Sequence, residues 1–196
     1  MTTAPAASPN MPTTAEPEPV PEGDSPREIL IESPLWERAP FAPGAAEAAT
    51  AKAAAAMAAE LDLGSEIGWA ILLADDATLR QLNRDHRGKD ALTNVLSFPS
   101  FPPGALPAAG HIGDVAIAAE TVIAEALDAG RPALHHLAHM AAHGVAHLAG
   151  LDHVTDREAE EMEATEVRAL ARMGLPNPYR AEPESTDGAA DGIPGA

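Results

Sequence analysis

The amino-acid sequence predicts an α+β domain flanked by two tails without regular structure. Three observations support this fold class: short apolar segments are interspersed with longer helix-like ones, glycine or proline stands near many of their ends, and both chain ends contain few large apolar residues. The 196 residues suffice for one domain, and a hydrophobic content of 45% is ample for a core. We therefore expect a folded domain over residues 27–180, with disordered acidic tails at 1–26 and 181–196.

Four segments are typical of β-strands. Residues 28–32 place three apolar residues between glutamates, and residues 67–73 form a longer apolar run. The segment 94–98 is expected to end at Pro99, because proline cannot donate a hydrogen bond to a strand ladder. A Pro/Gly-rich loop then leads to the last expected strand, 111–118.

Helices are expected between and after these strands. The first is the Ala-rich segment 44–62, since alanine has the highest helix propensity, and it closes near Gly64. Asp75 and Asp76 are both suitable N-caps for a second helix, whose apolar side includes Leu79.

The C-terminal half of the domain is expected to be helical. Helices are predicted at about 119–129, where Gly130 closes the first, and at about 133–149. Thr155 and Glu158 have the spacing of a capping box that opens the last helix, whose acidic first turns suit the positive end of the helix dipole. The core face of this helix is expected to contain Met162, Val167 and Leu170.

The string HGVAHLAGLDH contains three histidines at a spacing typical of a metal site. His143 and His147 are four apart and share one face of a helix. Gly150 can leave the helix in a left-handed conformation, which lets the chain turn back and bring His153 to the same ion. Three imidazoles leave one open position on a tetrahedral ion, as in catalytic sites. The sequence therefore predicts a transition-metal site with zinc as the expected ion; the alternative is three unrelated histidines in an Ala-rich helix.

The same string argues against a metalloprotease. Metzincin proteases have the pattern H-E-x-x-H-x-x-G-x-x-H, in which the glutamate is the general base. Gly144 occupies that position here. We therefore expect chemistry other than peptide hydrolysis, or a base supplied from elsewhere.

The charge of the chain bears on its partners. The formal net charge is −18 at pH 7, which disfavours direct binding to nucleic acid. Arg80, Arg84, Arg87 and Lys89 nevertheless place four of the 12 basic residues within ten positions. Any phosphate-binding surface should include this cluster, although a solvated helix face that balances nearby acids would have the same pattern.

The absence of cysteine excludes disulfides and thiolate ligands and suits a reducing cytosol. No run of about 18 apolar residues is present, so no membrane-spanning helix is expected. The start of the chain has neither the basic stretch nor the apolar core of a secretory signal. We expect a cytoplasmic protein without a membrane partner.

Three segments together carry a resemblance to a known family. They are LNRDHRGKDALTNVLSFP at 82–99, HIGDVAIA at 111–118 and HMAAHGVAHLAGLDHVTDREAEEMEATEVRAL at 139–170, with Asn177-Pro178-Tyr179 beyond. In these segments the chain resembles the bacterial YbeY family of metal-dependent endoribonucleases and ribosomal RNA maturation factors. The resemblance covers roughly residues 27–180.

The resemblance implies a small mixed sheet of about four strands packed with about five to six helices, and a zincin-like three-histidine site. It implies one Zn²⁺ per chain bound by His143, His147 and His153. The implied activity is single-strand-specific cleavage of RNA in ribosomal RNA processing (16S rRNA 3′ end maturation) and in ribosome assembly and quality control. Single-stranded and ribosomal RNA, the small ribosomal subunit and assembly factors are the implied partners, and DNA is not. A non-catalytic assembly factor, in which the metal only stabilises the fold, is the alternative.

Arg87 matches the functionally important arginine of the family. A guanidinium can meet the charge on phosphate oxygens with two hydrogen bonds, which lysine does less well, and Gly88 would allow close approach of a ribose-phosphate chain. An ion pair with Asp85 or Asp90 is the alternative for Arg87. The chain departs from the residues usual in the family at His86, Ala146 and Leu151.

Other polar residues near the motifs leave alternatives open. His139 lies one turn before His143, but three ligands at i, i+4 and i+8 would span about 12 Å, so we favour a buried position or a contact to another ligand. Asp152 could orient an imidazole or shape a turn, and Thr93 and Ser97 could contact RNA. No general base is evident, so water activated by the metal and a ribose 2′-OH both remain possible nucleophiles. Surface positions are expected for His111, His135 and His136, and a pocket position is the alternative for His111.

Overall fold

The computed structural model describes residues 27–180, and the tails expected to be disordered lie outside this range. The described chain forms, in order, β1 (Arg27–Ile31), the short 3₁₀ helix η1 (Pro34–Glu37), α1 (Ala45–Glu60), β2 (Ile67–Ala74), α2 (Asp76–Arg87), β3 (Val95–Pro99), β4 (Gly110–Ala118), α3 (Ala119–Asp128), α4 (Ala133–Leu148) and α5 (Asp156–Ala171). Within it, no helix is both long and apolar enough to cross a bilayer.

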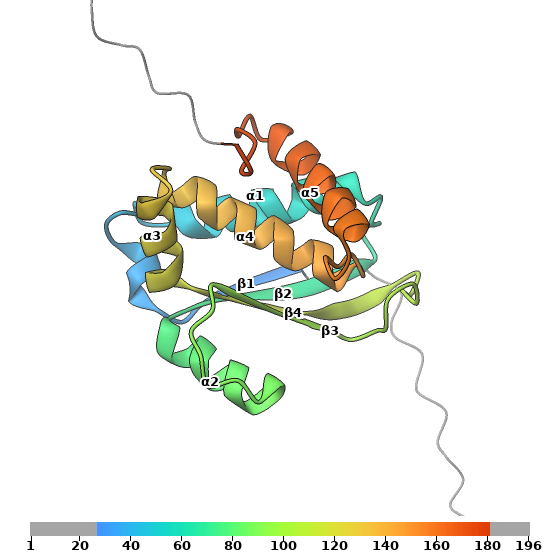
Figure 1. Ribbon diagram of the computed structural model, residues 1–196, viewed down its shortest axis with the longest axis horizontal. Coiled ribbons are helices and arrows are strands. Elements are labelled where there is room, and N and C mark those ends of the chain that lie inside the picture. Colours follow the sequence, from blue (N-terminus) through green and yellow to red (C-terminus); the bar gives the residue numbers. More distant parts are fainter. Residues whose placement is uncertain (1–26, 181–196) are drawn as a thin grey trace, which may run out of the picture.

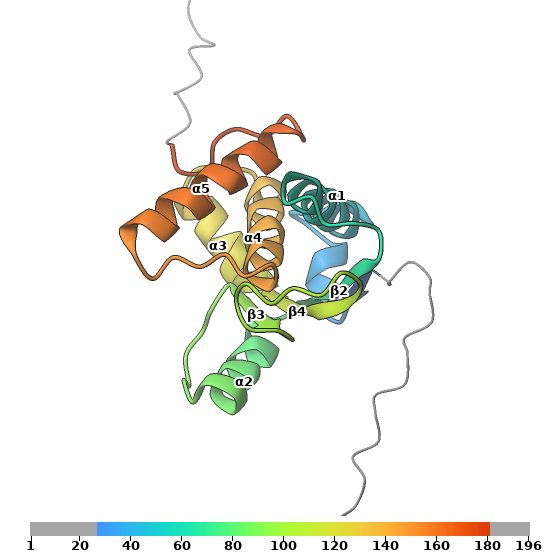
Figure 2. The ribbon, with the colours of Figure 1, turned by 90° about the vertical axis from the view of Figure 1, so that its right-hand side faces the viewer.

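The four strands form one mixed sheet in the order β1-β2-β4-β3. β1, β2 and β4 run parallel, whereas β3 runs antiparallel to β4 at the edge. α1, α4 and α5 lie on one side of the sheet with α3 at its end, and α2 lies alone on the other side (Figure 1). The view turned by 90° shows the same layers end-on (Figure 2). The predicted α+β class with four strands is confirmed.

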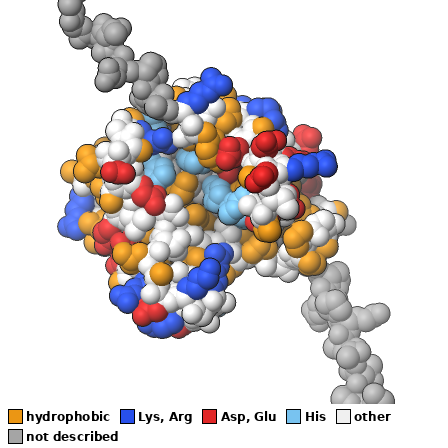
Figure 3. Space-filling model, viewed as in Figure 1, with side chains coloured by type: hydrophobic (Ala, Val, Ile, Leu, Met, Phe, Trp, Pro, Cys, Tyr) orange, Lys and Arg blue, Asp and Glu red, His pale blue; other side chains and the backbone are white. Residues whose placement is uncertain are grey.

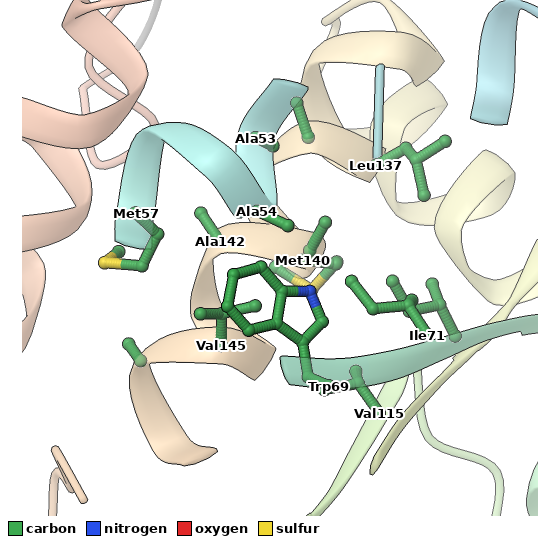
Figure 4. Close-up of a cluster of buried hydrophobic side chains, with 14 of the residues drawn as sticks. Ala53, Ala54, Met57, Trp69, Ile71, Val115, Leu137, Met140, Ala142 and Val145 are labelled. Atoms are coloured by element: carbon green, nitrogen blue, oxygen red, sulfur yellow. The ribbon is translucent and has the colours of Figure 1, made fainter. Parts of the chain in front are cut away.

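The main core lies between the sheet and the larger helical layer. Trp69 of β2 projects from the sheet toward α1 and α4, in the same cluster as Met57, Met140 and Val145 (Figure 4). The buried face of α1 is mostly alanine. Because these side chains are small, α4 can lie directly against α1, and α4 is held between that helix and the sheet. The helix with two of the predicted metal ligands is therefore packed on two sides, against α1 and against the sheet.

α2 covers the opposite face of the sheet with a smaller apolar cluster that includes Leu79 and Leu96. Asp75 is its N-cap, and its carboxylate accepts a hydrogen bond from the backbone N–H of Thr78 at 2.9 Å. Asp76, the other predicted cap, instead accepts from the hydroxyl of Thr121 at the start of α3. Gly88 caps the C-terminal end of α2, and its φ of 67° is a left-handed conformation.

Two details differ from the expectation. Pro99 is the last residue of β3 rather than its terminator, and it pairs with Gly113. Proline is tolerated there because β3 is an edge strand. On α5 Met162 and Leu170 are buried as expected, but Val167 is only partly buried. The buried positions four and seven residues after Met162 are Glu166 and Ala169, so the helix face turns away from Val167.

Candidate metal centre

α4 and the turn that follows it bring three histidines together. The Nε2 atoms of His143 and His147 lie 3.1 Å apart on one face of α4. Gly150 has a φ of 92°, as the sequence predicts, and the N–H of Leu151 bonds back to the carbonyl of Ala146 at 3.0 Å. The chain then turns back, so that ligand nitrogens of His143, His147 and His153 all lie within 4.8 Å of one another.

This donor set fits a divalent transition metal. Zinc binds histidine nitrogens at about 2.0–2.1 Å, which places neighbouring nitrogens of a tetrahedral site about 3.3 Å apart. The 3.1 Å between the two Nε2 atoms is close to that separation. Burial, followed by the positive charges that His143 and His153 can carry, lowers the pKa of His147 to about 4. The His147 ring is therefore neutral at pH 7, as a metal ligand must be.

A buried carboxylate lies behind the histidines. Glu166 of α5 has no exposed surface, and its Oε1 is 2.8 Å from Nδ1 of His143. Its Oε2 is 2.8 Å from Nε2 of His139 and accepts a hydrogen bond from the hydroxyl of Tyr179. Burial alone would raise the pKa of Glu166, but the hydrogen bonds from His139 and His143 outweigh it and lower the pKa to about 2. The group is therefore a carboxylate at neutral pH.

Sequence reasoning missed Glu166 because it lies within an acidic run. The signal that could have identified it is its spacing: Glu166 is four residues from both Met162 and Leu170, so it shares their buried face. By contrast, the buried position favoured for His139 is confirmed, with 8% of its surface exposed. His139 bonds to Glu166 instead, and it is not one of the three histidines whose nitrogens converge.

The three histidines open into a cleft with a volume of about 480 Å³. Figure 3 shows histidine side chains gathered in the middle of the face seen there. His143 and His147 are partly buried and His153 is exposed, so a bound ion would lie recessed but reachable. The cleft is lined by Arg87, Thr93, Asn94, Val95, Ser97, Pro99, His143, His147, Asp152 and His153.

Arg87 reaches this cleft from the end of α2. Its Nη2 donates a hydrogen bond to the carbonyl oxygen of Ser97 at 3.2 Å. The alternative of an ion pair with Asp85 or Asp90 is wrong, because these carboxylates pair with Arg84 and Arg80 at 3.4 and 2.5 Å. The basic cluster is thus divided: two of its arginines balance nearby acids, and Arg87 faces the histidines.

Gly144 marks where α4 rests on the sheet. A Cβ atom at this position would lie 2.6 Å from Cγ1 of Val115 on β4. The hydroxyl of Ser97 donates to the Gly144 carbonyl at 3.3 Å. The glutamate of the metzincin pattern could therefore not occupy position 144 without displacing the Val115 side chain.

The expectations for one aspartate and three further histidines have mixed outcomes. Asp152 shapes the turn, because its carboxylate accepts from the N–H of His153 at 2.8 Å. His111 is exposed as expected and lies 3.0 Å from Asp114. The exposed positions expected for His135 and His136 are wrong, since both are partly buried. Glu125 of α3 lies 2.7 Å from Nε2 of His136, so α3 covers this start of α4.

Comparisons with known proteins show which proteins the chain is similar to. The family model described as Endoribonuclease YbeY matches residues 37–174. A protein of Rhodopseudomonas palustris named Endoribonuclease YbeY is 48% identical over 156 residues, covering 78% of this chain and 80% of the relative. The protein of the same name from Azorhizobium caulinodans is 46% identical over 154 residues, covering 78% of this chain and 94% of its own.

Proposed function

Because the chain belongs to the YbeY family of endoribonucleases, we propose that it is a zinc-dependent endoribonuclease specific for single-stranded RNA. Its proposed role is ribosomal RNA processing at the 3′ end of 16S rRNA and ribosome assembly and quality control in the cytoplasm, with the small ribosomal subunit and assembly factors as partners. The observation that supports this function best is one cleft lined by both the three histidines and Arg87.

His143, His147 and His153 would hold the zinc ion. When bound, zinc supplies a water whose pKa is lowered to about 7 and a Lewis acid for a phosphoryl oxygen. The protein keeps the His147 ring neutral, as a ligand must be, and it places the site in a cleft between β3 and the turn after α4.

Arg87 would bind the scissile phosphate. One of its N–H groups is held by the Ser97 carbonyl, which fixes the orientation of the guanidinium while leaving other donors free. Negative charge grows on the non-bridging oxygens during phosphodiester cleavage, and a preorganised guanidinium can stabilise that charge with paired hydrogen bonds. In the described part of the chain no carboxylate forms an ion pair with Arg87 that a phosphate would have to displace.

The recessed site favours single-stranded RNA. A phosphodiester must enter the cleft to approach the partly buried His143 and His147. A single strand can extend a phosphate and splay its bases, whereas the backbone of an A-form duplex is fixed by its pairing. The selection of RNA strand is thus proposed to follow from access.

A cleavage assay with purified protein tests the proposal. The wild type is expected to cut a labelled single-stranded RNA and to leave the matching duplex and DNA intact. H147A and chelation by EDTA should each abolish cleavage. H111A is the matched control, because His111 is exposed and does not line the cleft, and it should cut like the wild type. Cleavage that persists in H147A would reject the proposed site.

A non-catalytic ribosome-assembly factor is the second candidate. It is favoured by the charge, because 30 acidic and 12 basic residues disfavour binding of naked RNA. Under this alternative the metal only joins the turn after α4 to the helix. It predicts no cleavage by metal-loaded protein together with rRNA maturation in cells that does not depend on Arg87.

A further inference from the structure

We propose that Glu166 is the positioning residue of the metal centre: it holds His143 through Nδ1 and thereby directs Nε2 of His143 toward the ion, while His139 and Tyr179 hold Glu166. This inference rests on the proposed zinc site. It adds the residues that fix a ligand in place, and it makes the segment after α5 part of the centre.

The contacts of His143 define which nitrogen binds the ion. Its Nδ1 is 2.8 Å from the Glu166 carboxylate, which can only accept, so Nδ1 carries the hydrogen. The lone pair is then on Nε2, the atom that lies 3.1 Å from Nε2 of His147. A carboxylate bound to the far nitrogen of a ligating imidazole fixes its ring and increases its basicity. Glu166 thus selects the tautomer that the site requires.

The position of Glu166 is costly for a residue with only a packing role. Its side chain is fully buried on the face of α5 that contains Met162, Ala169 and Leu170. Burial of a carboxylate is unfavourable unless several donors compensate it, and an apolar residue would avoid that cost. The three donors that surround Glu166 come from His139, His143 and Tyr179. The carboxylate is therefore built into a network that ends at a metal ligand.

His139 and Tyr179 hold the second oxygen of Glu166. His139 lies one turn before His143 on α4, so a single carboxylate can bridge both rings. The ring of Tyr179 lies edge-on to His139 at a centroid distance of 5.3 Å. Burial and the Glu166 carboxylate raise the pKa of Tyr179, so its hydroxyl keeps the proton that it donates.

The Tyr179 contact links the metal centre to the segment after α5. α5 ends at Ala171, and the backbone N–H of Tyr179 donates to the side chain of Asn177 at 2.8 Å, which shapes a local turn. This turn brings the tyrosine back over the buried carboxylate. The segment therefore adds the Tyr179 hydroxyl to the network that begins at His143.

Metal affinity tests this inference independently of RNA cleavage. The full chain is stripped of metal, and Zn²⁺ binding is measured by competition with a chromogenic chelator for the wild type, E166Q, Y179F and the control E160Q. Glu160 is an exposed glutamate on α5, so E160Q makes the same change of charge away from the network. E166Q is expected to weaken Zn²⁺ binding about 10–100-fold, Y179F by a smaller factor, and E160Q not at all.

A second readout separates positioning from general stability. The visible absorption of the Co²⁺-loaded protein reports ligand geometry, and circular dichroism reports whether each metal-free variant is folded. A folded E166Q with wild-type Zn²⁺ affinity and an unchanged Co²⁺ spectrum would overturn the inference. If E166Q does not fold, Y179F and H139Q decide, and wild-type affinity in both would overturn it. A wild type that binds no Zn²⁺ would instead reject the proposed function.

Discussion

Gly144 of α4 lies so close to Val115 of β4 that a Cβ atom on the glycine would come within 2.6 Å of a valine methyl group. The helix that presents two of the three histidines therefore packs closely on β4 at a residue without a side chain. A side chain at position 144, including the glutamate of the protease pattern, would collide with Val115.

Replacing Gly144 by alanine should destabilise the protein. Glycine to alanine within a helix is normally stabilising by about 1 kcal/mol, but here the new methyl group would overpack a buried interface, which typically costs about 1–3 kcal/mol. Urea unfolding of G144A is expected to show this loss. In a V115A background the same substitution should cost less, because the clashing methyl groups are gone. Equal costs in both backgrounds would contradict the close contact with Val115.

Arg87 should affect cleavage without affecting metal binding. Removal of a preorganised donor to a transition-state oxygen typically lowers the rate by about 10²–10³-fold, and R87A is expected to lower kcat/KM for single-stranded RNA to that extent. R87K should recover only part of the rate, because lysine lacks the paired donors. R84K is the matched control, since Arg84 lies on the same helix and is paired with Asp85. Equal loss of rate in R84K and R87K would argue against a specific role.

Much of the fold could be predicted from the sequence because its signals are local. The capping box of Thr155 and Glu158 is present as expected, and so is the left-handed turn at Gly150. The convergence of His143, His147 and His153 followed from the same turn. Each of these features depends on residues within about ten positions of one another.

The missed features depend on contacts between distant segments. Glu166 meets His139 and His143 only because α5 packs across α4. In the sequence, only its spacing distinguishes Glu166 from the other acidic residues around it. Sequence reasoning also left the partner of Arg87 open, since the Ser97 carbonyl is brought near by the packing of α2 on the sheet. Local patterns define elements, and their assembly defines these pairs.

The metal-free protein should lose stability as the pH falls below about 6.5. Burial lowers the pKa of His136 from 6.5, against a weaker raising effect of its hydrogen bond with Glu125. The unfolded chain therefore takes up a proton near pH 6.5 that the folded protein binds only at lower pH, so stability is full above 6.5 and declines as the pH falls toward the folded pKa. Urea unfolding between pH 8 and pH 5 measures this slope. In H136Q the slope should be shallower but not zero, because the lowered pKa of His147 contributes a loss of the same sign. An unchanged slope in H136Q would contradict the assignment.

Removal of the metal should abolish activity while leaving the domain folded. The core between the sheet and α1, α4 and α5 is formed by apolar side chains and does not depend on the histidines. A ligand that binds only the folded state adds about 2.7 kcal/mol at 100 times its Kd, so Zn²⁺ should raise Tm and a chelator should reverse the rise. H153A should lose most of this rise, because His153 is the ligand from the turn after α4, whereas H111A should retain it. Thermal scans with and without Zn²⁺ measure the effect, and a metal-free protein that is unfolded at 25 °C would show that the metal has a structural role as well.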